Sequence, residues 1–158
     1  MKSEQVLISL TSHFPGEAPS VRQIPAEIRG VRQDDFYAVR LSYEQVLDEE
    51  SGEKEPEVMT FRIGEDGSVR RVSVKRPKSA VLMEFEEGKT CLAAYPTPAG
   101  TLDVTIRTRK VEGSLLEERL VANVLYEILL GEMSQGEIRL EIRSEIIRGN
   151  FLTAAVDY

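Results

Sequence analysis

The sequence has few of the residues on which enzyme and metal chemistry usually depend. Its 158 residues include one cysteine, one histidine and no tryptophan. A single cysteine excludes an intrachain disulfide and supplies no metal-ligand pair, while any Ser-His-Asp or Cys-His arrangement would have to use His13. Neither His13 nor Cys91 is flanked by a catalytic motif. We therefore expect a protein that is not an enzyme and needs no metal or organic cofactor.

Long hydrophobic runs, glycine-rich phosphate loops and a signal-peptide pattern are also missing. A membrane-spanning helix needs about 18 consecutive apolar residues, so we expect a cytoplasmic protein without a membrane partner. The net charge of −7 and the pI near 4.9 argue against a nucleic-acid partner, because a phosphate backbone binds clustered Lys and Arg. The basic residues between Arg70 and Lys78 are interpreted as the solvated face of a strand.

Acidic side chains gather between Asp48 and Glu57, around Gly52 and Pro56. The segment has no large apolar residue, which is typical of a loop. It also lacks the alternating Asp and Asn, the glycine and the distal glutamate of a calcium-binding loop. We predict a solvated loop there and no metal site.

What the sequence does contain is alternation of apolar and polar residues with a period of two. From Glu137 to Ile146 every second residue is apolar apart from Ser144, and the residues between are charged. Such a pattern places all the apolar side chains on one face of a β-strand, whereas a helix would scatter them. A looser version, rich in β-branched residues, surrounds Val104.

The segment from Ser114 to Leu130 is open to two interpretations. Ser114 and Glu117 form a capping box and Gly131 follows, as for a helix. The even-numbered residues from Leu120 to Leu130 nevertheless form an unbroken apolar row. We predict a strand, with Val121, Leu125 and Leu129 projecting outward.

Turn signals separate further strand-like segments along the chain. An Asp-Gly turn at 64–67 predicts one hairpin, and a glycine-containing turn at 86–89 predicts another, between 81–85 and 90–95. Pro25 places the segment 20–29 at an edge or bulge. The pattern favours an all-β antiparallel meander closing into a barrel or a sandwich, as one domain over 1–147 with a C-terminal extension over 148–158. The predicted core residues are Leu102, Val104, Ile106, Leu120, Val124, Ile128, Ile138, Leu140 and Ile142.

Several ordered motifs resemble those of the YwiB-like family of bacterial domains of unknown function. They are Leu41-Ser42-Tyr43-Glu44, Phe85-Glu86-Glu87-Gly88-Lys89, Tyr95-Pro96-Thr97-Pro98-Ala99-Gly100-Thr101-Leu102, Ile106-Arg107-Thr108 and Tyr126. The resemblance covers roughly 6–147 and implies a calycin-like, lipocalin-type β-barrel in a cytoplasmic protein. It implies no catalytic residues, because the family's activity is not established.

Two functions are compatible with such a barrel. An eight-stranded barrel can hold one small ligand, so the mouth could bind a small amphipathic molecule. Its aromatic walls and anionic-group contacts would come from Tyr43, Arg76, Tyr95, Arg107 and Tyr126. Alternatively, the barrel is packed solid and serves as an interaction or assembly module. The outward stripe at Leu125 favours a homodimer, unless the tail at 151–156 covers it.

Overall fold

Every regular element in the described part of the chain is a β-strand. The computed structural model describes residues 3–33, 36–48, 50–79, 81–97, 100–116 and 119–146. The strands are β1 (Ser3–His13), β2 (Ser20–Gln33), β3 (Phe36–Asp48), β4 (Glu53–Ile63), β5 (Val69–Arg76), β6 (Val81–Glu86), β7 (Thr90–Thr97), β8 (Gly100–Leu116), β9 (Arg119–Leu130) and β10 (Met133–Ile146). This confirms the all-β prediction. None of the described residues forms a helix that could cross a membrane.

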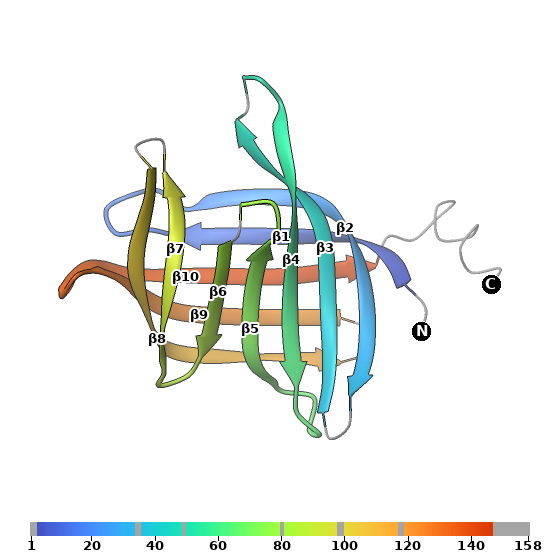
Figure 1. Cartoon of the computed structure of the whole chain (residues 1–158). Coiled ribbons are helices and arrows are strands. Elements are labelled where there is room, and N and C mark those ends of the chain that lie inside the picture. Colours follow the sequence, from blue (N-terminus) through green and yellow to red (C-terminus); the bar gives the residue numbers. More distant parts are fainter. Residues whose placement is uncertain are drawn as a thin grey trace.

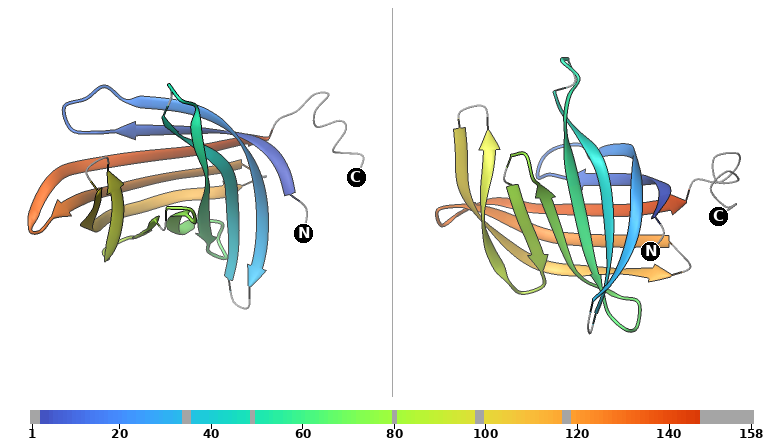
Figure 2. Two further views of the ribbon diagram at one scale, coloured as in Figure 1. Left: turned by 45° about the horizontal axis from the view of Figure 1, so that its top comes forward. Right: turned by 45° about the vertical axis from the view of Figure 1, so that its right-hand side comes forward.

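The strands form one antiparallel sheet in the order β6-β5-β4-β3-β2-β1-β10-β9-β8-β7. Since β1 pairs with β10, the first and last strands lie in the middle of the sheet. The sheet curls until its two edges, β6 and β7, approach each other, which nearly closes a barrel. In Figure 1, β1, β10 and β9 run across the back and β3 to β7 cross them in front. Figure 2 shows the same layers, with the ends of β3 and β4 projecting beyond the rest.

The predicted hairpin between β6 and β7 is wrong in one respect. Its turn is present, with Lys89 N donating to Glu86 O at 3.0 Å, but no ladder joins β6 to β7 in the described residues. The turn bonds to β8 instead: Gly88 N donates to Thr108 O and Thr108 N to Lys89 O, both at 3.0 Å. These bonds hold the start of β7 against β8, so the seam of the barrel falls here.

The segment at 114–130 is confirmed as strand, divided between β8 and β9. The even row at Leu120, Ala122 and Val124 is completely buried. A register shift between Thr108 and Lys110 changes which residues of β8 face inward. Thr108 lies before this shift and continues the inward row of Val104 and Ile106, so it is buried although it lies outside the predicted core.

Most of the predicted core lies inside the barrel. Ile106, Leu120, Val124 and Ile142 are fully buried, and Val104 and Ile138 nearly so; Ile128 and Leu140 are partly buried against the core. Leu102 is 46% exposed, which corrects its assignment. It lies near the start of β8, where the β7–β8 hairpin extends beyond the opposite layer (Figure 1).

The predicted outward stripe on β9 is largely covered within one chain. Leu129 is 7% exposed, and Val121 and Leu125 are half-buried. Arg143 pairs with Val121 and Arg139 with Leu125, and the stems of such long side chains can cover apolar neighbours. The stripe is thus partly covered within one chain, and the homodimer stays a prediction. The tail at 151–156 and the extension at 148–158 lie outside the described residues.

Candidate functional site

The segment predicted as an acidic loop is mostly strand. β3 continues to Asp48 and β4 starts at Glu53, so Glu55 and Glu57 extend the inward row of Met59, Phe61 and Ile63. The side chains of Glu55 and Glu57 are only 6% and 3% exposed. The prediction was wrong because it rested on the acidic composition alone. Glu55 and Glu57 continue the alternation of inward and outward side chains that begins at Met59.

Glu57 brings together two of the residues proposed from the sequence. The hydroxyl of Tyr43 on β3 donates to Glu57 Oε2, and Arg76 Nε at the end of β5 donates to Glu57 Oε1 at 2.6 Å. The Arg76 side chain is 14% exposed, so this ion pair is largely removed from water. Three neighbouring strands are therefore joined by charge-assisted hydrogen bonds inside the barrel.

Glu55 lies two residues nearer the connection between β3 and β4 and has its own partners. Ser79 Oγ donates to Glu55 Oε2 at 2.5 Å, and Arg76 Nε lies 3.9 Å from Glu55 Oε1. Beside them, Arg22 on β2 donates to the buried Gln45 side chain at 2.8 Å. We call Tyr43, Gln45, Glu55, Glu57 and Arg76 the acidic cluster.

The cluster is a low-dielectric environment. Burial, and then the charge and hydrogen bond of Glu57, hold the pKa of the Tyr43 hydroxyl far above its ordinary value of 10.0. Arg22 and Arg76 act in the opposite direction with smaller effect. Tyr43 is thus held as a neutral hydrogen-bond donor to a buried carboxylate.

A crevice opens beside the cluster because β2 and β3 separate. Their pairing ends at Glu27 and Ser42, while both strands continue beyond it. Pro25, which lacks an N–H donor, lies in the part of β2 that pairs with β1 alone. The crevice has a volume of about 510 Å³, within the range of small-molecule sites, and Arg22 and Gln45 line it.

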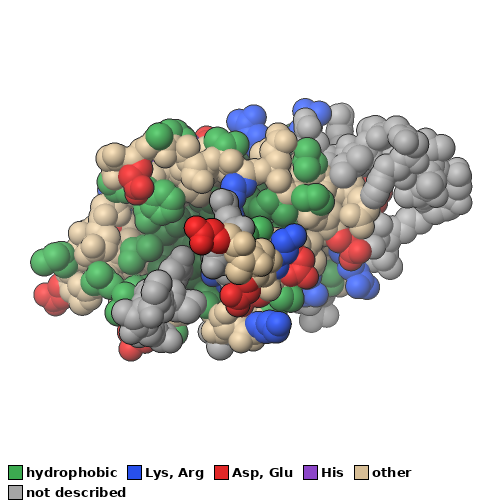
Figure 3. Space-filling view, turned by 90° about the horizontal axis from the view of Figure 1, so that it is seen from above, with side chains coloured by type: hydrophobic (Ala, Val, Ile, Leu, Met, Phe, Trp, Pro, Cys, Tyr) green, Lys and Arg blue, Asp and Glu red, His purple; other side chains and the backbone are tan. Residues whose placement is uncertain are grey.

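The barrel is hollowed at the end seen in Figure 3, which we call the open end, and the side of this end away from the acidic cluster is apolar. The inward row on β8, β9 and β10 includes Ile128 and Leu140, which contact the core yet are only partly buried. Leu130 and Leu102, on the same rows, are 39% and 46% exposed. Figure 3 shows hydrophobic side chains gathered around a hollow in the left half of the view from above, with charged side chains to its right. The open end is therefore polar on one side and apolar on the other.

Thr108 adds an unmatched polar atom to the interior. Its side chain is 1% exposed, it is paired in register with Tyr126, and its Oγ1 has no hydrogen-bond partner among the described residues. A buried hydroxyl without a partner is costly. Alternation places Thr108 on the inward row of Val104 and Ile106, but as a polar residue it was left out of the predicted core.

The remaining residues proposed from the sequence are not gathered at the cluster. The ring of Tyr126 packs on Phe85, with centroids 4.7 Å apart. Arg107 lies on the outer face, 53% exposed, where it pairs with Glu127 at 2.8 Å. Tyr95 pairs with Leu102 through its backbone, and its side chain lies outside the described part. In the described residues, no three His, Cys, Asp or Glu side chains are arranged to hold a metal ion.

Comparison with known proteins gives a family match and a fold match. A family model described as a domain of unknown function, DUF1934, matches residues 20–142. The crystal structure of the ywiB protein from Bacillus subtilis is similar, with a TM-score of 0.65 and 18% sequence identity over 92% of each chain. At that identity the likeness concerns the fold alone. A search of curated proteins finds no match.

Proposed function

The chain belongs to the DUF1934 family of domains of unknown function, and we propose that it binds a small amphipathic molecule in the open end of its barrel without catalysing a reaction. One observation carries the proposal. Two buried carboxylates, Glu55 and Glu57, lie in the same barrel interior as inward-facing apolar side chains that are only partly buried. A packed core would bury such apolar residues and exclude the carboxylates.

The charge of the cluster favours a particular head group. Arg76 and Arg107, assigned from the sequence to an anionic group, both face carboxylates instead. Glu55 and Glu57 together have more acceptor sites than Tyr43, Ser79 and Arg76 fill. A ligand whose head group donates hydrogen bonds, such as an amine or a hydroxyl, suits these acceptors, while its apolar body suits Ile128 and Leu140.

The Cys91 thiol and the His13 ring are the two groups that could act in catalysis, and the environments of both favour a binding role over a catalytic one. Burial raises the pKa of the Cys91 thiol, and Sγ donates to Glu84 O at 3.2 Å, so the reactive thiolate is scarce. The His13 ring bonds to Glu141 on the outer face at 2.9 Å. Neither group lies beside the acidic cluster in the strand register.

Fluorescence titration with 1-aminoanthracene tests the proposal, with anthracene as the probe that lacks the amine. We expect saturable binding of the amine and about tenfold weaker binding to Glu55→Gln, since a hydrogen bond to a charged group is lost. Anthracene should bind both proteins alike. The matched control is Glu137→Gln, which changes an exposed glutamate paired with Arg109. Unfolding curves of both variants verify that they are folded.

Two results would overturn the proposal. One is the absence of saturable binding of either probe. The other is equal affinity of Glu55→Gln and Glu137→Gln for the amine. A barrel that binds neither probe and sediments as a dimer would instead favour an interaction or assembly module.

A further inference from the structure

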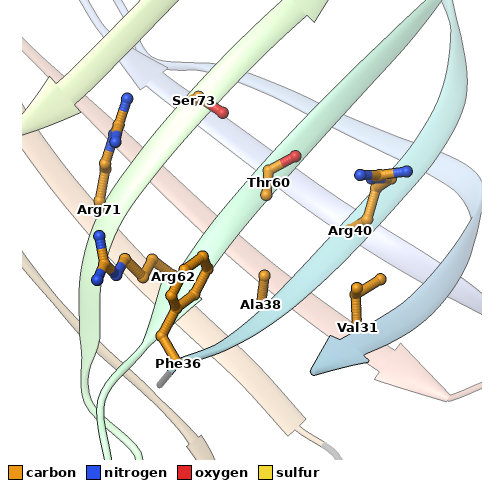
Figure 4. Close-up of a pocket in the computed structure, with 8 residues that line it drawn as sticks. All are labelled: Val31, Phe36, Ala38, Arg40, Thr60, Arg62, Arg71 and Ser73. Atoms are coloured by element: carbon orange, nitrogen blue, oxygen red, sulfur yellow. The ribbon is translucent and has the colours of Figure 1, made fainter. Parts of the chain in front are cut away.

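A second site lies on the outer face of the sheet, over β3, β4 and β5. It is a shallow groove of about 240 Å³, and six of its lining residues bear on the argument: Phe36, Arg40, Thr60, Arg62, Arg71 and Ser73. Figure 4 shows the Thr60 and Ser73 side chains between Arg71 on one side and Arg40 on the other. We call this feature the arginine groove.

The strand register concentrates positive charge on this face. Arg29 pairs with Arg40 across β2 and β3, and Arg62 pairs with Arg71 across β4 and β5. The two rows that contain these pairs hold four arginines and no acidic residue from β2 to β5. Like charges directly opposite each other destabilise a sheet. Two such pairs in adjacent rows are unexpected in a chain with a net charge of −7.

The protein itself compensates this charge only in part. Arg71 forms an ion pair with Glu84 on β6. The Arg62 guanidinium lies over the ring of Phe36, 4.2 Å from its centroid, which holds the group in place while its edge can still donate hydrogen bonds. Arg40 has no ion-pair partner among the described residues and is exposed. The unmet positive charge therefore lies beside the two hydroxyls.

We infer that the arginine groove binds the phosphoryl group of a small phosphorylated molecule. Arginine forks match the oxygens of a phosphate, and the hydroxyls of Thr60 and Ser73 supply further donors between them. A bound dianion would also relieve the repulsion between the paired arginines. The modest volume and the acidic charge of the whole chain favour a small ligand over an extended polyanion. This site is independent of the one inside the barrel.

Backbone amide chemical shifts, measured by NMR at constant ionic strength, provide the test. The probes are inorganic phosphate, a nucleoside monophosphate, a short single-stranded oligonucleotide, and chloride as the reference. We expect saturable shifts around Thr60 and Ser73 with phosphate and the monophosphate. Arg40→Gln should weaken binding about tenfold through loss of a charge-assisted contact. The control Arg109→Gln changes an exposed arginine paired with Glu137 and should bind like the parent.

A second measurement keeps the test independent of folding defects. Because Arg40→Gln removes one like-charge pair, its urea midpoint without phosphate should equal or exceed that of the parent, and phosphate should raise the parent's midpoint more. If phosphate and chloride act alike, or if Arg40→Gln and Arg109→Gln bind phosphate equally, the inference is wrong. Saturable shifts with the oligonucleotide alone would also overturn it, in favour of a nucleic-acid surface.

Discussion

Glu57 connects three strands inside the barrel, and its surroundings explain why a charged residue is tolerated there. Its two oxygens accept hydrogen bonds from Tyr43 and Arg76, and all three side chains are largely shielded from water. A buried charge is acceptable only when it is paired and hydrogen-bonded. Removing one member of the group should therefore cost more than the loss of one bond.

Replacing Glu57 by Gln should lower the free energy of unfolding by about 3 kcal/mol, because it leaves the Arg76 charge buried beside a neutral amide. Urea denaturation measures the change. Glu137→Gln, in an exposed pair, should cost no more than about 1 kcal/mol. Equal costs for the two variants would show that the acidic cluster is well solvated.

Tyr43 should make the protein sensitive to alkaline pH. Its folded pKa is raised above the ordinary value of 10.0, so the stabilisation is complete below that value and is lost as the pH rises through it, when the unfolded chain releases the proton and the folded chain does not. Tyr43→Phe should be less stable than the parent by about 1.5 to 3 kcal/mol near neutral pH. The difference should shrink between about pH 9 and 11. Urea midpoints across this range test it, and a constant difference would contradict the assignment.

The path of β8 is irregular at two places. It changes register after Thr108, and at Gly113 the backbone adopts φ 147°. A β-carbon built there would lie 2.1 Å from Val121 O and 2.7 Å from Ala122 Cα, both backbone atoms of β9. The glycine thus permits a close approach of β8 and β9 that no other residue allows.

Gly113→Ala should accordingly destabilise the barrel by more than about 3 kcal/mol, since both backbone strain and overpacking contribute. The comparison is Gly131→Ala, at φ 64° with open space around its β-carbon, which should cost about 1 to 2 kcal/mol. Thermal or urea unfolding distinguishes them. Similar losses in both variants would mean that β9 can move away from β8 at little cost.

At the scale of the whole barrel, the free edges are β6 and β7, whereas β1 and β10 pair with each other in the middle of the sheet. The seam is bridged where β8 meets the turn between β4 and β5: Leu115 N donates to Gly67 O at 2.8 Å, beside an isolated bridge between Ser68 and Ser114. Every other neighbouring pair of strands has a continuous or bulged ladder. The seam is therefore the weakest part of the closed surface.

Hydrogen exchange should reveal this seam. Amides on the unpaired edges of β6 and β7 should exchange through local opening at little free-energy cost, whereas those of β1 and β10 should approach the global free energy of unfolding, about 5 to 15 kcal/mol. Exchange followed by NMR at single residues tests the difference. Equal protection of β6 and β1 would indicate that β6 and β7 pair in solution.

The local pattern was sufficient for most of the strands and for most of the antiparallel pairs between neighbours, although it missed the start of β4 and wrongly paired β6 with β7. Period-two alternation assigns each strand a buried face, and short turns such as Asp66-Gly67 force neighbouring strands to pair. The all-β meander followed from these properties. Tyr43 and Arg76, both proposed from the sequence, share one hydrogen-bond partner inside the barrel. Their shared partner Glu57 was missed, because acidic composition outweighed the alternation that Glu57 maintains.

How deeply a side chain is buried, and where the barrel closes, depend on contacts between distant segments and cannot be inferred from the pattern. Alternation shows which side of a strand faces inward, but the length of the opposite layer decides whether that side is covered: Ile106 is fully buried and Leu102, on the same row, is 46% exposed. A bulge near Thr108 reverses the inward side without any change in composition. The position of the seam likewise depends on a contact between distant residues. Gly88 bonds to Thr108, twenty residues later in the chain, and this contact holds β7 against β8 and leaves β6 unpaired on one side.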